Sequence, residues 1–171
     1  MTIGILVFAG ITQLDATGPL EVFTNIPGAK VLLIAKRKRP VDANGMIRFL
    51  PHADLRSCPK LDILCIPGGG GVNSLLLDDE VLGFVRRRAR TARYVTSVCT
   101  GSLLLGAAGL LKGRRAACHW ASLSLLAAFG AKPSRRRIVQ DGNVITAGVT
   151  SGIDFALFVT SKVVSVKFRT F

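Results

Sequence analysis

Short apolar runs rich in β-branched residues recur along the chain and alternate with segments that favour helix. The runs that predict strands are 2–8, 31–35, 61–66 and 94–98. The segments that predict helices are 13–23, 80–90, 100–110 and 121–129. Strands and helices that alternate with short connections are typical of a mainly parallel sheet covered on both faces. We therefore expect an α/β fold, a three-layer sandwich around such a sheet.

Turn signals add detail to this pattern. Asn44-Gly45 within 41–50 predicts a small antiparallel hairpin, and Asp141-Gly142-Asn143 predicts a second one between 138–139 and 144–146. A short strand is expected near 115–118. The spacing Ser151-x-x-Asp154 resembles a capping box and predicts the start of a final helix.

Composition indicates one globular domain, 1–171, because 49% of the 171 residues are hydrophobic and there is no repeat or linker. Lys and Arg exceed Asp and Glu by 23 to 10, which gives a net charge of +13. The basic residues are dispersed in separate clusters, and few aromatic residues are available to stack on bases. We therefore do not expect nucleic acid as the main partner. The basic clusters are 36–39, 86–93, 114–115 and 135–137.

The four cysteines are Cys58, Cys65, Cys99 and Cys118, and no two of them form a C-x-x-C pair. With two histidines in the chain, this spacing argues against a metal site. No basic segment with a cleavage site opens the sequence, so we expect a protein of the reducing cytoplasm. The uncharged stretch 94–111 is better explained as strand, turn and helix than as a membrane span.

Cys99 lies where the apolar run 94–98 gives way to a Leu-, Ala- and Gly-rich helix. At such an elbow a side chain projects above the sheet, and the start of the helix places partial positive charge beside the sulfur. Both effects favour the thiolate, which makes Cys99 a candidate nucleophile. A small buried hydrophobic residue is the alternative role for this cysteine.

The loop Pro67-Gly68-Gly69-Gly70-Gly71 ends the run 61–66. It lacks the lysine and the Ser/Thr of a P-loop, and its spacing is not that of a dinucleotide fingerprint. Glycine lets a backbone N–H approach a reacting centre, so the amides of Gly69 and Thr100 are candidates for stabilising a developing negative charge. A simple strand-ending turn is the alternative.

Asp15, Gly69, Cys99 and His119 each follow a predicted strand. The carboxyl ends of parallel strands meet at one edge of a sheet, where ligands bind in folds of this class. We therefore expect these four residues at one site. Asp15 as a helix-capping or turn residue, and Thr100 as a helix cap, are the structural alternatives.

Several motifs occur in an order that resembles the ThiJ/PfpI superfamily, which has a class I glutamine amidotransferase-like fold. They are Ile66-Pro67-Gly68-Gly69, Val95 to Ser102, Gly113-Arg114-Arg115-Ala116 and His119-Trp120. Within the superfamily, residues 13–19 and 151–157 are most similar to the bacterial isonitrile hydratases. The resemblance covers residues 1 to about 158. The sensor domains of some AraC-type transcription regulators are similar in the same places.

The resemblance implies a flavodoxin-like sandwich, a homodimer, and hydration of an isonitrile to an N-substituted formamide without metal or organic cofactor. Cys99 would attack the isonitrile carbon to form a thioimidate, with Asp15 as general acid and base. Thr100 matches a functional position, and its hydroxyl would orient water or substrate. His119 is expected in a secondary role, lining the pocket, while Trp120 is expected in the core.

Two other functions remain open at this point. One is a ligand-sensing domain of a transcription regulator. The other is amidase, protease or glyoxalase-like chemistry, in which His119 would activate Cys99. The resemblance also ends early, because residues 163–171 alternate like a strand where the family continues as a helix. We therefore expect the C-terminal part, about 159–171, to be atypical or truncated.

Overall fold

A seven-stranded sheet forms the centre of the molecule, and the computed structural model describes it within residues 1–43 and 47–164. Its strands are β1 (Thr2–Leu6), β2 (Lys30–Ala35), β5 (Ala53–Asp54), β6 (Ile63–Ile66), β7 (Tyr94–Val98), β10 (Ile138–Asp141) and β11 (Val144–Ala147). They are arranged in the order β10-β11-β7-β6-β1-β2-β5. Neighbours are parallel except for the antiparallel pair β10–β11, which confirms the expected mainly parallel α/β fold.

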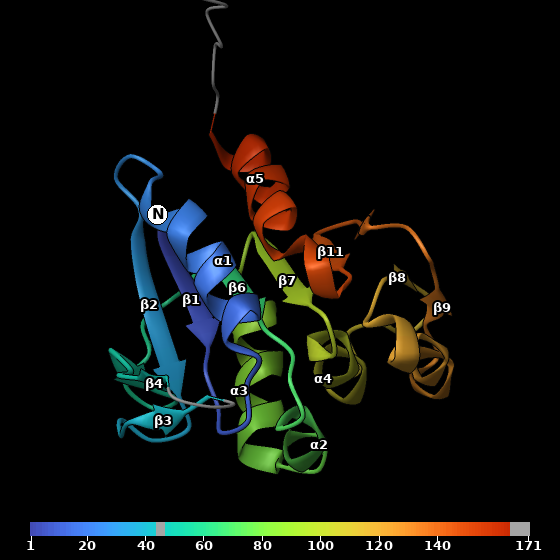
Figure 1. Cartoon of the computed structure of the whole chain (residues 1–171), viewed down its shortest axis with the longest axis horizontal. Helices are drawn as coiled ribbons and strands as arrows, with labels where there is room; N and C mark the ends of the chain where they lie inside the picture. Colours follow the sequence, from blue (N-terminus) through green and yellow to red (C-terminus); the bar gives the residue numbers. More distant parts are fainter. Residues whose placement is uncertain (44–46, 165–171) are drawn as a thin grey trace, which may run out of the picture.

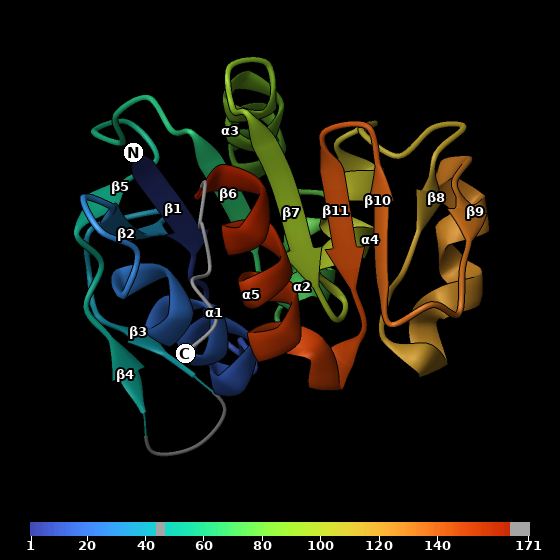
Figure 2. The ribbon, with the colours of Figure 1, turned by 90° about the horizontal axis from the view of Figure 1, so that it is seen from above.

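Helices cover both faces of this sheet and produce three layers (Figure 1). On one face lie α1 (Gln13–Thr24) and α5 (Gly152–Val163), which pack against each other. On the other lie α2 (Val72–Leu75), α3 (Asp79–Ala89) and α4 (Gly101–Ala107). The view from above shows α1 and α5 side by side in front of the strands (Figure 2).

Burial on both faces explains why the central strands are mainly apolar, with the buried hydroxyl groups of Thr96 and Ser97 in β7 as exceptions. All four residues of β6 are buried, and so are the last four residues of β7. Phe23 of α1 and Phe155 of α5 meet edge to face, with ring centroids 6.5 Å apart, and fill the core on their side. Phe84 of α3 is fully buried on the other side.

Smaller elements flank the sheet. β3 (Val41–Asp42) and β4 (Arg48–Phe49) pair antiparallel as expected, while the predicted turn at Asn44-Gly45 lies outside the described residues. The short strand predicted near 115–118 is β8 (Arg115–Ala116), which pairs with β9 (Lys132–Pro133) in a separate two-stranded sheet. The helix that follows β8 is the 3₁₀ helix η1 (Trp120–Phe129).

The hairpin of β10 and β11 is confirmed, and Gly142 in its turn has a φ of 63°. The predicted start of the final helix is confirmed, with Ser151 as the N-cap residue of α5, but the Ser151 side chain makes no cap hydrogen bond, so the capping box itself does not form. Asp154 instead binds Arg137, whose Nε lies 2.6 Å from its carboxylate. An ion pair with the neighbouring segment therefore replaces the local cap.

The final helix extends further than the sequence pattern predicted. α5 ends at Val163, so the strand-like alternation expected from Val163 onward begins with a helical residue. The remainder of that alternation, 165–171, lies outside the described residues. Within residues 1–43 and 47–164, none of the helices has the length and apolar character needed to cross a membrane.

Candidate active site

Cys99 sits at the sharp turn between β7 and α4. Its φ of 57° makes it the one non-glycine residue with positive φ in the described part of the chain. The Cys99 amide donates to the carbonyl of Ala147 at the end of β11, with 3.0 Å between nitrogen and oxygen. The strained backbone and this bond hold the thiol at the carboxyl edge of the sheet, as the elbow pattern predicted.

Asp15 reaches the elbow because two strand-end loops are joined. The Thr12 amide donates to the Gly68 carbonyl at 2.9 Å, and the Gly71 amide donates to the Gly10 carbonyl at 3.1 Å. This pairing places the first turn of α1 over the loop that follows β6. Asp15 Oδ2 then accepts a hydrogen bond from the Gly68 amide at 3.2 Å. The carboxyl is not a helix cap, and Asp15 is only 1% exposed.

Burial of Asp15 and Cys99 beside each other determines their protonation. Burial raises the pKa of Asp15 to about 6, although the Cys99 thiol, the Gly68 amide and the His119 charge oppose the rise. Burial, reinforced by the Asp15 charge, raises the pKa of Cys99 to about 12, and the Thr100 amide opposes it. The expectation of a resting thiolate is therefore wrong. Burial and the neighbouring carboxylate raise the pKa of the thiol by more than the N-terminus of the short helix α4 lowers it.

Thr100 and Gly69 bind each other. The Gly69 amide donates to Thr100 Oγ1 at 2.9 Å, and the same hydroxyl donates to the Gly69 carbonyl at 3.2 Å. Thr100 occupies the N-cap position of α4 but makes no side-chain cap bond. Its amide is the backbone donor beside the Cys99 sulfur. The Gly69 amide is already occupied by the Thr100 hydroxyl, so a role for Gly69 in stabilising an oxyanion requires that bond to be exchanged.

Gly69 also joins the two loops. Its φ is 134°, and a Cβ there would overlap the backbone of Gly10 and Thr12. Only glycine can adopt this positive φ and also leave room for the backbone of Gly10 and Thr12.

His119 is the N-cap residue of η1. Its Nδ1 accepts a hydrogen bond from the Ala121 amide at 3.2 Å, which leaves Nε2 as the nitrogen that carries the proton in the neutral ring. The imidazole acts electrostatically on Asp15. The groups that shift the pKa of the thiol are, besides burial, Asp15 and Thr100.

A buried hydrogen-bond chain ties the elbow to the segment that carries His119. Ser97 and Ser102 share a hydrogen bond of 2.8 Å between their hydroxyl oxygens, and the Ser102 hydroxyl donates to the Ala117 carbonyl at 2.6 Å. The Ala117 amide in turn donates to Thr146 Oγ1 at 2.7 Å. All three side chains are fully buried. They fix residues 116–118 relative to β7, α4 and β11.

Sequence reasoning missed two contributions. Gly68 supplies the amide that binds Asp15; its position in the glycine loop was visible, but which of four glycines faces the acid depends on tertiary contacts. Trp120 was expected in the core and is 79% exposed. Its ring lies against His119, with centroids 5.3 Å apart.

Among the described residues, no group of three or more His, Cys, Asp or Glu side chains is placed to hold a metal ion.

Comparison with known proteins identifies the family. The model of the DJ-1/PfpI family matches residues 1–162. The chain belongs to the DJ-1/PfpI family. Among the curated DJ-1/PfpI relatives, it is 48% identical to the isonitrile hydratase of Pseudomonas putida over 167 residues, which are 97% of this chain and 73% of that enzyme.

Other members of the DJ-1/PfpI family extend this comparison. A crystal structure of a ThiJ/PfpI family protein from Pseudomonas syringae superimposes with a TM-score of 0.92 at 43% identity, covering 94% of this chain and 68% of the other. The transcriptional regulator GbdR of Pseudomonas aeruginosa is 27% identical over 91% of this chain, but the match covers only 44% of the regulator. Regions similar to this chain therefore occur both in an isonitrile hydratase and within a longer transcriptional regulator.

Proposed function

We propose that the protein is an isonitrile hydratase that converts R–N≡C and water into R–NH–CHO, in the class of carbon–oxygen lyases. The observation that carries the proposal is the buried pair of Asp15 and Cys99, in which the acid has a pKa of about 6 and the thiol one of about 12. The pair holds one transferable proton at neutral pH. The 48% identity to the Pseudomonas putida isonitrile hydratase supports this chemistry.

The first step adds the thiol across the isonitrile carbon. The Asp15 carboxylate accepts the Cys99 proton and delivers it to that carbon, whose lone pair becomes the new C–H bond. Sγ bonds to the same carbon, and the C≡N bond becomes the C=N bond of a thioimidate, R–N=CH–S–Cys99. The Thr100 amide stabilises the sulfur while its negative charge develops.

The second step opens the thioimidate with water. Asp15, again a carboxylate, takes a proton from water while the water oxygen bonds to the thioimidate carbon. The nitrogen takes that proton as the C=N bond becomes single. The C–S bond then breaks, the sulfur receives the hydroxyl proton through Asp15, and R–NH–CHO leaves. The thiol and the carboxylate are restored, so the cycle consumes one water and no other reactant.

The remaining residues support this pair in the proposal. Thr100 and Gly69 fix the loop against the elbow through their reciprocal hydrogen bonds. His119 lines the site and tunes Asp15 through its charge. A cysteine-histidine mechanism of the amidase, protease or glyoxalase type is less well supported, because the thiol responds to Asp15 and Thr100.

We further propose that the enzyme is a homodimer. Leu14 of α1 and Ile153 and Leu157 of α5 are each more than half exposed, although all are large and apolar. α1 and α5 pack side by side, so these side chains belong to one surface that a second copy would cover. Light scattering after gel filtration of Ile153→Asp against the unchanged protein tests this, and an unchanged mass would contradict it.

Incubation with cyclohexyl isocyanide, followed by chromatography for N-cyclohexylformamide, tests the function. The unchanged protein should form the formamide, and Cys99→Ala and Asp15→Ala should each lose nearly all turnover because the two groups act as a unit. Full activity in Cys99→Ala would overturn the mechanism. Dependence on His119 but not on Asp15 would favour the cysteine-histidine alternative.

A ligand-sensing role is the second candidate, and the match to part of the regulator GbdR favours it. It predicts binding without turnover. If the folded protein forms no formamide from any isonitrile supplied, the hydratase proposal fails and this candidate replaces it.

A further inference from the structure

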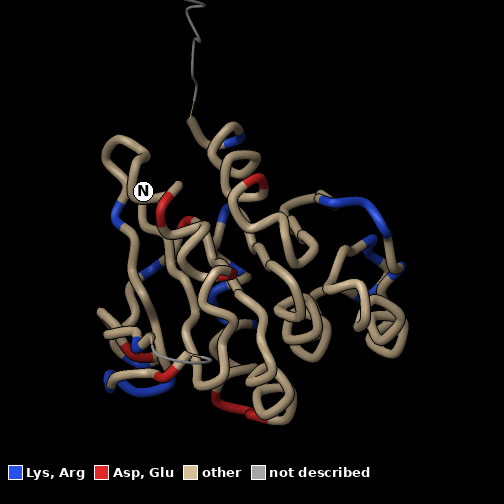
Figure 3. The backbone as a smooth tube through the Cα atoms, viewed as in Figure 1, with Lys and Arg blue, Asp and Glu red and all other residues tan. Residues whose placement is uncertain are grey.

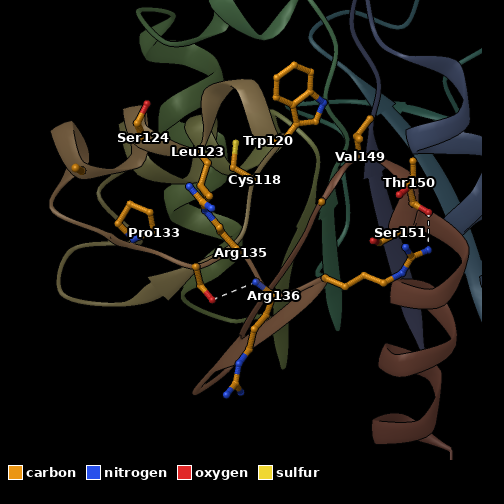
Figure 4. A pocket seen from close by; sticks show the side chains of 14 residues that line it. Cys118, Trp120, Leu123, Ser124, Pro133, Arg135, Arg136, Val149, Thr150 and Ser151 are labelled. Carbon is orange, nitrogen blue, oxygen red and sulfur yellow. Dashed lines mark hydrogen bonds between the residues drawn. The ribbon is translucent and has the colours of Figure 1, made fainter.

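A groove of about 980 Å³ lies beside η1. Its walls are η1, the segment between β9 and β10, and the loop that follows β11 (Figure 4). Its volume is in the range of small-molecule sites.

The groove is fixed to the reacting centre through the backbone. Ala147, whose carbonyl accepts the Cys99 amide, is followed directly by the lining residues Gly148 and Val149. On the opposite wall, Cys118 and Trp120 flank His119 in the sequence, and all three belong to one segment. These two segments link the elbow to the groove, and a substrate group that extends from the carbon at Cys99 along them leads toward the groove.

The charged residues that line the groove are all arginines. No Asp or Glu is among its lining residues, whereas Arg135, Arg136 and Arg137 are consecutive (Figure 3). Arg137 is already bound, by Asp154 and by the Thr150 carbonyl. Arg135 extends toward Leu123 inside the groove, while the side chain of Arg136 points away from it (Figure 4). Within the described ranges, the ion pairs do not include Arg135.

An apolar surface completes the groove. Trp120 is 79% exposed and presents a large ring, and Leu123 and Val149 line the same space. A groove lined by a guanidinium, an indole and aliphatic groups matches a molecule with an apolar body and an anionic end. A neutral hydrocarbon would leave Arg135 without a partner, and a cation would be repelled.

We propose that this groove binds the R group of the substrate and selects an isonitrile whose apolar body carries a carboxylate, with Arg135 binding the carboxylate and Trp120 contacting the body. The inference rests on the proposed hydratase function for the reaction, but the binding of the anion is independent of turnover. Two measurements therefore separate the two proposals.

The first measurement is of binding alone. Trp120 is the single tryptophan of the chain, so indole fluorescence reports on this groove. The probes are trans-4-formamidocyclohexanecarboxylate and uncharged N-cyclohexylformamide, neither of which reacts. The carboxylate should bind more tightly, and Arg135→Gln should weaken it about tenfold, the typical value of one charge-assisted hydrogen bond. Arg136→Gln removes the same charge one residue away and should have a much smaller effect.

Equal affinity for the two probes would overturn the inference. So would equal loss in Arg135→Gln and Arg136→Gln, because that result indicates general attraction to a basic surface. Circular dichroism of both variants confirms that they are folded.

The second measurement is turnover of trans-4-isocyanocyclohexanecarboxylate against cyclohexyl isocyanide. The unchanged protein should have a higher kcat/KM for the carboxylate. Arg135→Gln should abolish that preference, whereas Arg136→Gln should retain it. Turnover of both substrates without preference would overturn the inference and leave the hydratase proposal standing. Absence of turnover with tight carboxylate binding would overturn the hydratase proposal and show that the groove nevertheless binds anions.

Discussion

Asp15 accepts its hydrogen bond from Gly68, a residue of the loop that abuts the nucleophile, with 3.2 Å between Oδ2 and the amide nitrogen. A Cβ on Gly68 would lie 2.7 Å from Cys99 Cβ and 2.6 Å from the Thr100 nitrogen. One glycine therefore contacts the acid through its amide and the nucleophile through its α-carbon. The separation of the two reacting groups depends on this residue having no side chain.

Gly68→Ala is expected to inactivate the enzyme. The added methyl group must displace the backbone of Thr100 or the side chain of Cys99, and misplacement of about 1 Å lowers kcat/KM by about 100-fold. Gly70→Ala is the matched control, because a Cβ at Gly70 has no atom within 4 Å. Kinetics with cyclohexyl isocyanide compare the two variants. Similar activity in both would show that the close approach at Gly68 does not set the geometry.

The pH dependence of turnover follows from the shared proton. Asp15 must be ionised to accept the thiol proton, and burial raises its pKa to about 6. kcat/KM should therefore fall as the pH is lowered below about 6 and should be level between there and mildly alkaline pH, since the thiol loses its proton only near pH 12. A rate profile from pH 4.5 to 9 measures this. Activity that rises toward acid would contradict Asp15 as the proton acceptor.

Asp15 should also make the protein less stable at neutral pH. Its pKa is about 6 in the fold and 3.8 as the ordinary value, so the native state binds the proton more tightly than the unfolded chain. The stability that protonated Asp15 contributes is complete below about pH 4 and is lost as the pH rises through 6. The loss amounts to about 2–3 kcal/mol.

Asp15→Asn removes this titration while its side-chain oxygen can still accept from Gly68. Urea unfolding should therefore show that the free energy of unfolding of the variant, relative to that of the unchanged protein, is higher at pH 7.5 than at pH 4. The difference should be up to about 3 kcal/mol. Asp79→Asn is an exposed control, since Asp79 is in the first turn of α3 on the surface. An equal difference in the free energy of unfolding at both pH values would show that burial does not raise the pKa of Asp15.

The sequence predicted the elements that local pattern determines. Apolar β-branched runs identified β1, β2, β6 and β7, because strands buried on both faces consist mainly of apolar residues. The elbow at Cys99 was visible in the change of propensity at that residue. The arrival of Asp15 and Cys99 at one edge followed from strand direction alone.

Properties that depend on tertiary contacts were not predictable in the same way. The helix start at Cys99 predicted a lowered thiol pKa, but burial and Asp15 raise it. Ser151 and Asp154 have capping-box spacing, yet Asp154 binds Arg137, which is 17 residues away. Trp120 is apolar enough for a core but faces the groove. For Cys99 and Asp154, a partner distant in the sequence outweighs the local preference.

Ser102 is predicted to stabilise the wall that carries His119. Its hydroxyl joins Ser97 to the Ala117 carbonyl, and both partners lie in the interior. Ser102→Ala leaves the Ser97 hydroxyl and the Ala117 carbonyl without this partner, which should lower the free energy of unfolding by about 1–3 kcal/mol. Ser74→Ala in α2 removes an exposed hydroxyl and should change it by less than about 0.5 kcal/mol. Urea unfolding curves of the two variants and the unchanged protein provide the comparison. Because the chain Ser97–Ser102–Ala117–Thr146 positions the residues before His119, Ser102→Ala should also loosen the groove and reduce the affinity for the carboxylate probe. A variant as stable as Ser74→Ala would show that the buried chain does not hold this wall.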